Sequence, residues 1–149
     1  MTGGNRITLA LLIGLGGILV AAGVIFYTRF WAPNRKLMDP EWFATASDAK
    51  RLEVAHQVLA WPWGNHHDAF LIVRELGGPE SVPRLIRALR WQPDGPAVPC
   101  TKSHCLDALR HITGVDAGDS YVEWNRWWDS VAHQVPPRPT TQPASAPMP

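Results

Sequence analysis

Two stretches in the middle of the chain place apolar residues at the spacing of amphipathic helices. The first carries Ala69, Ile72, Val73 and Leu76, and the second carries Val82, Leu85, Ile86 and Leu89. Spacing of three and four residues puts each set on one helix face. The Gly77-Gly78-Pro79 corner joins them, so we expect two helices folded back antiparallel. One such pair leaves an apolar edge uncovered, which predicts a helical repeat packed against neighbouring units.

A second unit repeats this pattern at a constant offset of 36 residues, from position 69 to position 105. Its apolar positions are Cys105, Ala108, Leu109 and Ile112. Gly114 is expected to end this helix, and Ser120 with Glu123 forms a capping box for a last helix that runs to about residue 132. The tryptophans at 124, 127 and 128 share one face of that helix. We interpret them as core or end cap.

Local signals predict the remaining elements of the domain. Ser47 or Asp48 caps a helix that runs to about residue 60, with Trp61-Pro62-Trp63-Gly64 ending it. Asn65 stands at the cap position of the next helix, and Gly77-Gly78 predicts a left-handed exit from it. Pro79 suits the first position of the following helix, which extends to about residue 91. The fold class is therefore all-α.

The N-terminal stretch 7–28 contains no charged residue and is rich in Leu, Ile and Val. At roughly 1.5 Å per residue it is long enough to cross a hydrocarbon layer about 30 Å thick. We predict a single transmembrane helix over 7–28, in contact with the lipid bilayer, after a short tail at 1–6. A cleaved secretory signal is the alternative, because Arg6 provides a basic start and Val20-Ala21-Ala22 resembles a cleavage site. The long apolar run favours a retained anchor.

The side of the membrane that carries the domain stays open. Arg6 precedes the span, whereas Arg29, Arg35 and Lys36 follow it, which favours a cytoplasmic domain. Cys100 and Cys105 would form a disulfide only in an oxidising compartment. Within the span, small residues recur as Ala10, Gly14, Gly17 and Ala21. Such a seam permits close helix packing and self-association, although small residues are also common in spans generally.

Composition sets the boundaries of the other segments. Residues 29–40 hold two prolines and mixed charge, so we expect a juxtamembrane linker there. The helical domain is expected over 41–134. Residues 135–149 are rich in proline and poor in apolar side chains, which predicts a disordered tail.

The segment LIVRELGGPESVPRLIRAL resembles the HEAT-like repeats first grouped with the phycobilin-lyase family. The matching residues are Leu76, Gly77, Pro79, Val82, Pro83, Leu85, Ile86, Ala88 and Leu89. The later stretch CLDALRHITGVDAGDSYVEWNRWW is similar to the closing unit of some bacterial HEAT-repeat proteins. The resemblance implies a HEAT-like domain with a surface for binding another macromolecule. It carries over no lyase residue.

Charge and chemistry narrow the function. The formal net charge of +1 gives no field that would recruit nucleic acid, so no nucleic-acid partner is expected. A metal- or thiol-dependent activity centred on Cys100, His104, Cys105 and His111 is an alternative function. The chain lacks a C-x-x-C pair, and no His pair at i, i+4 lies beside a Glu, so no metal or cofactor is expected. We expect His66 and His67 to be exposed residues of a first helical turn.

Arg84, Arg87 and Trp91 lie opposite the apolar stripe of their helix. Arg and Trp are the side chains that concentrate binding energy in protein interfaces, so these three are the predicted partner-binding residues. A plain solvated face is the alternative interpretation. The sequence as a whole predicts a membrane-anchored helical-repeat protein that acts as an interaction or scaffolding module for an unknown protein partner. It is not expected to be an enzyme.

Overall fold

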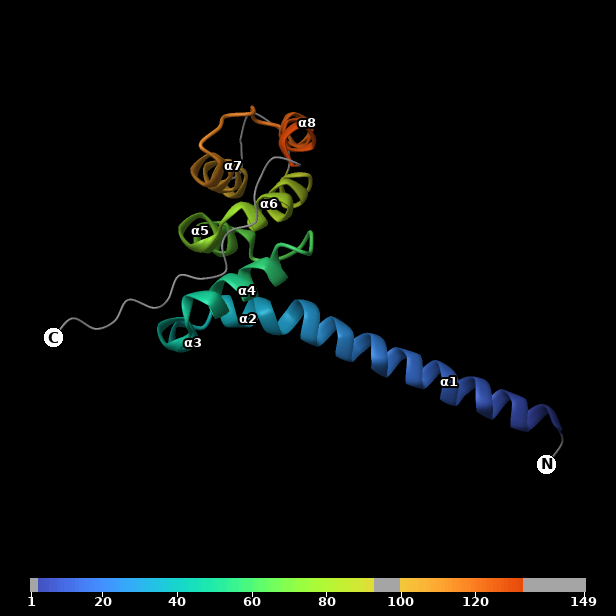
Figure 1. Ribbon diagram of the computed structural model, residues 1–149. Coiled ribbons are helices and arrows are strands. Elements are labelled where there is room, and N and C mark those ends of the chain that lie inside the picture. The colour runs from blue at the N-terminus through green and yellow to red at the C-terminus, as the bar shows by residue number, and fades with distance from the viewer. Residues whose placement is uncertain (1–2, 93–99, 133–149) are drawn as a thin grey trace.

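The computed structural model describes residues 3–92 and 100–132, with side chains from residue 11 onward. Every regular element in these residues is helical, and a long N-terminal helix projects from a stacked helical body (Figure 1). The elements are α1 (Gly3–Phe26), a π-helical turn (Tyr27–Trp31), α2 (Ala32–Leu37), α3 (Pro40–Thr45), α4 (Asp48–Val58), α5 (His66–Leu76), a 3₁₀ turn (Pro79–Ser81), α6 (Val82–Leu89), α7 (Cys100–Thr113) and α8 (Tyr121–Val131). The prediction of an all-α chain with an apolar N-terminal helix is confirmed.

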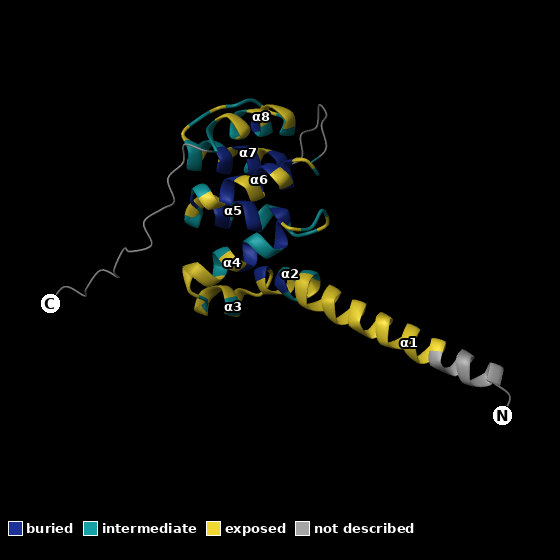
Figure 2. Ribbon diagram, turned by 45° about the vertical axis from the view of Figure 1, so that its right-hand side comes forward, coloured by how far each residue is buried: buried dark blue, intermediate teal, exposed yellow. Residues whose placement is uncertain are grey.

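Helix α1 stands away from the body (Figure 1), and its residues 11–26 contribute nothing to the core. Residues 11–26 are exposed along their whole length (Figure 2). The helix is long and apolar enough to cross a membrane. A helix buried in the core would show the opposite pattern, because its apolar face would be covered by neighbouring elements.

The expected linker at 29–40 is instead helical and partly docked, so this prediction is wrong. The chain passes from α1 through the π-helical turn into α2, which packs against α4. Leu37 is 6% exposed and belongs to the core. Pro33 lies in the first turn of α2, directly after the π-helical turn, where the i→i−4 ladder is already interrupted. The body therefore begins within α2, before residue 41.

Helix α3 was not expected either, although its start follows an ordinary rule. Asp39 accepts hydrogen bonds from the backbone N–H groups of Glu41 and Trp42, at 3.0 and 3.2 Å. Pro40 occupies the first turn, where a missing N–H costs nothing. An Asp-Pro pair of this kind is a helix-start signal.

The main packing runs between successive helix pairs. Helix α5 packs against α4 and α7, and α6 packs against α7 and α8. Side chains that line this core with no exposure are Ala55, Val58, Ala69, Phe70, Val73, Leu85, Ala88, Cys105, Ala108, Leu109 and Trp124. The small residues Ala69 on α5 and Ala108 on α7 allow these two helices to approach closely. The apolar stripes of α5 and α6 are therefore buried, except for Leu76, which is partly buried against the core.

The corner at Gly77 differs from the expected left-handed exit. Gly77 has φ −75° and ψ 161°, and Gly78 is also extended, so neither glycine is left-handed. The reason for a glycine at 77 is space. A Cβ added there would collide with the carbonyl oxygen and side chain of Val73 and with the hydroxyl of Ser81. The backbone thus turns tightly against the end of α5.

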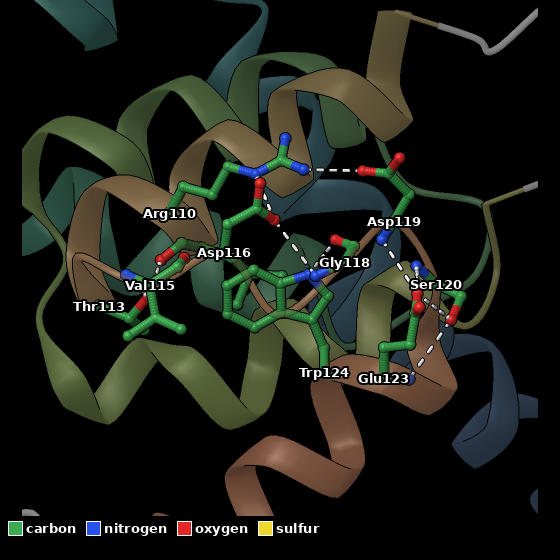
Figure 3. Close-up of polar contacts among 10 residues, drawn as sticks. Arg110, Thr113, Val115, Asp116, Gly118, Asp119, Ser120, Glu123 and Trp124 are labelled. Carbon is green, nitrogen blue, oxygen red and sulfur yellow. Dashed lines mark hydrogen bonds and ion pairs between the residues drawn. The ribbon is translucent and has the colours of Figure 1, made fainter.

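The loop between α7 and α8 follows the prediction closely (Figure 3). Gly114 has φ +69° and ends α7, and Ser120 with Glu123 forms the capping box of α8. Trp124 has no exposure, and its indole N–H donates to the Gly118 carbonyl at 2.8 Å. Hydrogen bonds therefore fix the loop at several points, and the tryptophan closes the end of the core.

Candidate interaction surface

The structure divides the three residues predicted to bind a partner. Arg84 and Arg87 are exposed, whereas Trp91 is half-buried and packs against the core. Arg87 and Trp91 line a hollow of about 370 Å³ between α6 and α8. Arg84 faces a different hollow of about 280 Å³, which borders α4 and the π-helical turn. Only Arg87 and Trp91 therefore line the same hollow.

The hollow between α6 and α8, here called the α6/α8 hollow, combines cations with aromatic rings. Its lining residues are Pro83, Ile86, Arg87, Arg90, Trp91, Tyr121, Asn125 and Trp128. The Arg90 guanidinium carbon lies 5.8 Å from the centre of the Tyr121 ring, a cation–π distance. None of these lining residues is acidic, so a ligand that enters meets positive charge and flat apolar surface.

Several lining residues were missed by the sequence analysis, although helical spacing points to them. Arg87 lies in α6, and Arg90 and Trp91 follow at i+3 and i+4 in the turn that ends the helix. Tyr121 and Trp128 stand at i and i+7 on α8, and both side chains are half-buried. Each set therefore shares one helix face. The sequence did not show that these two faces oppose each other, because that depends on how α8 returns across α6.

Trp91 is held in place by a buried histidine. The rings of Trp91 and His66 are nearly parallel, with centres 6.2 Å apart. His66 is 5% exposed, so the expectation that it is an exposed residue is wrong. Its Nε2–H donates to the Trp61 carbonyl at 2.6 Å, and the Gln92 amide donates to its Nδ1 at 3.0 Å. Burial lowers the pKa of His66, which keeps the ring neutral for these two bonds.

A second hollow of about 310 Å³ lies across α8. It is lined by Pro79, Val82, Ile112, Thr113, Trp127, Trp128 and Val131. Trp128 borders this apolar hollow and also the α6/α8 hollow. The interpretation of the tryptophan trio as core or cap is confirmed for Trp124, while Trp127 and Trp128 are partly buried and pack on the core from outside.

The possible disulfide between Cys100 and Cys105 is absent from this structure, in which both residues are free thiols. They lie in one helix, five residues apart, which separates them by about 7.5 Å along the axis. A disulfide needs Cα atoms within about 7 Å. Cys105 is fully buried, its thiol contacts the Leu85 carbonyl at 3.4 Å, and burial raises its pKa. Cys100 is exposed.

The residues of the alternative metal or thiol centre, Cys100, His104, Cys105 and His111, do not converge on one site. The His104 ring packs edge-on against His67, with ring centres 4.6 Å apart, whereas His111 is exposed. Cys105 points into the core. Within residues 3–92 and 100–132, no group of three or more His, Cys, Asp or Glu side chains has the geometry to hold a metal ion.

The small-residue seam of α1 is open along the part that the structure describes. A Cβ added at Gly14 or Gly17 would meet no other atom within 4 Å, and Ala21 is exposed. The side chain of Ala10 lies outside the described residues, as do the predicted tail at 135–149 and the loop residues 93–99. The seam is therefore free of contacts from the chain's own body.

Comparison with known proteins finds no matching protein family, no similar curated protein and no similar solved structure.

Proposed function

We propose that the protein is a membrane-anchored, HEAT-like helical-repeat module that binds a protein partner and has no catalytic activity. The observation that carries this proposal is the α6/α8 hollow, where Arg87 and Arg90 stand beside Trp91, Tyr121 and Trp128. Arginine and aromatic side chains dominate the energetics of protein interfaces. The apolar positions of α5 and α7, which match at an offset of 36 residues, support the repeat assignment, and the exposed apolar α1 supports the anchor.

The chemistry of the hollow indicates the kind of partner. Two guanidinium groups without an acidic neighbour among the lining residues favour a partner segment that carries carboxylates. The Trp91 ring, stacked on His66, offers a rigid flat surface that loses little entropy on binding. The partner is therefore a protein with an acidic segment that also presents apolar side chains. Cys105 does not favour a thiol activity, since its thiol is buried and its pKa is raised.

The anchor is tested by extracting membranes with alkali. We expect the full-length protein to stay in the membrane pellet at its unprocessed mass, because α1 presents an apolar surface as long as the hydrocarbon layer. Removing residues 1–26 should release the remaining body into the supernatant. Appearance of the unprocessed protein in the alkaline supernatant, or of a shortened natural form there, would contradict a retained anchor.

The binding surface is tested by photocrosslinking in intact cells. A photoreactive residue at Asn125, which lines the α6/α8 hollow, should give a discrete protein adduct. The double substitution Arg87→Glu and Arg90→Glu should reduce that adduct at least tenfold, roughly the effect of losing 1.4 kcal/mol of binding. Arg74→Glu is the matched control, because Arg74 is an exposed arginine on α5 outside this hollow.

Two outcomes would overturn this surface. One is an adduct at Asn125 that persists unchanged in the double variant. The other is a loss of the Asn125 adduct in Arg74→Glu as large as the loss in the double variant. Far-UV circular dichroism of the variants checks that the helical body is intact in each case.

A further inference from the structure

The turn Trp61-Pro62-Trp63-Gly64 is fixed to the end of the apolar helix. Trp61 packs edge-on against Phe30, with ring centres 6.1 Å apart, and Phe30 comes directly after Arg29, the first charged residue beyond the span. In both Figures 1 and 2 the connection between α4 and α5 projects on the side of the body from which α1 departs. The turn therefore lies at the level where the hydrocarbon layer would end.

Hydrogen bonds make this placement rigid. The Asn34 side chain donates to the Phe30 carbonyl at 2.7 Å and accepts from the Asn65 backbone N–H at 2.6 Å. One amide thus ties the chain leaving the span to the residue after the turn. Gly64 contributes by close approach, since a Cβ there would lie 2.8 Å from the Val58 carbonyl oxygen. The turn cannot swing away without breaking these contacts.

Trp63 lies in this turn, and most of its surface is left uncovered by the residues that the structure describes. It is 73% exposed, compared with 69% for Leu11 within the span itself. A large exposed indole on a fixed turn is costly in water, and tryptophan is enriched at the headgroup level of bilayers.

Beside the turn lies the hollow that Arg84 borders. It is lined by Arg29, Glu53, His56, Gln57, Ala60, Trp61 and Arg84. Arg29 and Arg84 have no ion pair with any other described residue, and both are exposed. The only acidic lining residue is already engaged, because Glu53 lies 2.6 Å from the Lys50 ammonium and accepts from the Gln57 amide at 3.1 Å.

Burial and the charge of Arg84 lower the pKa of His56 to about 4, so that side chain adds no charge near neutrality. Its Nε2 lies 2.9 Å from the hydroxyl of Ser81. The hollow therefore offers two uncompensated guanidinium groups beside an aromatic wall. Guanidinium groups bind phosphate oxygens in a bidentate manner, which suits a monoanionic ligand of phosphate size.

We propose that this hollow binds the phosphate of an anionic phospholipid headgroup while Trp63 inserts into the same leaflet. The proposal depends on the membrane anchor of the proposed function, because the span is what brings the hollow to headgroup depth. It assigns to the body a second attachment to the bilayer, distinct from α1 and from the α6/α8 hollow. The result is a body held against the lipid surface.

Lipid binding is tested with the full-length protein in nanodiscs of phosphatidylcholine, with or without phosphatidylglycerol. After release into the gas phase, native mass spectrometry should show phosphatidylglycerol retained in preference to phosphatidylcholine. Arg84→Gln should weaken that retention roughly fivefold, the share expected of one cation near an anionic surface. Arg74→Gln, on α5, should leave it unchanged.

Trp63 insertion is measured with a nitroxide at position 63, in a Cys100→Ser background, by its collisions with oxygen and with a water-soluble nickel complex. Position 63 should be shielded from nickel in the nanodisc. The matched control is Phe43, an exposed aromatic with Arg51 over its ring at 4.7 Å. Phe43 belongs to α3, which lies on the side of the body away from α1 (Figure 1). Position 43 should remain open to nickel.

The outcomes separate this proposal from the anchor itself. A nitroxide at Val20 that is shielded, together with an exposed position 63 or a retention of phosphatidylglycerol unaffected by Arg84→Gln, would overturn the headgroup site and leave the anchor standing. An exposed Val20 would instead show that the span is not inserted and would overturn both. Displacement of the bound lipid by millimolar glycerol phosphate would show a site for free phosphate and would also overturn the lipid assignment.

Discussion

Trp124→Ala should lower the free energy of unfolding by about 3–5 kcal/mol, the usual cost of truncating a fully buried aromatic side chain. Trp124 has no exposure, and its ring meets Trp127 edge-on with centres 5.5 Å apart. The substitution opens a cavity and also leaves the Gly118 carbonyl without its indole donor, which sits at 2.8 Å. Both losses act in the last of the described helices, α8, at the end of the core.

The measurement is chemical denaturation of the full-length protein in detergent micelles, followed by far-UV circular dichroism. Trp63→Ala is the control, since Trp63 is 73% exposed and its replacement should change the free energy of unfolding by less than about 0.5 kcal/mol. A loss below about 1 kcal/mol for Trp124→Ala would mean that the tryptophan does not close the core as described.

Gly118→Ala should lower the free energy of unfolding by roughly 2–4 kcal/mol, because it strains the backbone and also removes a helix cap. Gly118 has φ +115°, outside the left-handed region that other residues tolerate, so strain accounts for about 1–3 kcal/mol. A Cβ there would also meet the carboxylate of Glu123, which accepts from the backbone N–H groups of Asp119 and Ser120 at 3.1 and 3.0 Å. Displacing that carboxylate removes the capping box, worth about 1 kcal/mol.

Gly114→Ala is the matched control for this effect. Gly114 has φ +69°, near the ordinary left-handed conformation, and a Cβ there would meet nothing within 4 Å. Gly114→Ala should lower the free energy of unfolding by about 1–2 kcal/mol. Thermal denaturation of the two variants should therefore rank Gly118→Ala as the less stable. Equal midpoints of thermal unfolding would show that the Glu123 side chain moves aside without a loss of stability. That result would contradict the claim that its cap fixes the loop.

The closing loop was predictable because its signals are local. Ser120 and Glu123 are three residues apart, and Gly114 directly follows its helix, so chain neighbours alone determine both features. The buried faces of α5, α6 and α7 were likewise predicted correctly from helical spacing, since burial follows the apolar stripe whichever helix covers it. The sequence therefore predicted most of the elements and their inner faces.

What the sequence did not predict depends on contacts between distant residues. His66 was expected at the surface, yet it is buried because Gln92, 26 positions later, bonds its ring. The 29–40 segment was expected to be a linker because its prolines suggested a break, but Leu37 finds a place in the core against α4. Arg84 and Arg87 were grouped by their helix face, whereas neighbouring helices place them in separate hollows.

The unbroken passage from α1 through the π-helical turn into α2 has a mechanical consequence. Because helical residues connect α1 to the docked α2 without a loop, we expect α1 and the body to turn together. A change in the inclination of α1, produced for example by a thicker or thinner lipid layer, is then transmitted as a rotation of the whole body. Two copies that paired along their α1 helices would likewise hold their bodies in one relative orientation. The geometry of the α1 pair would then decide which surfaces of the two bodies face each other.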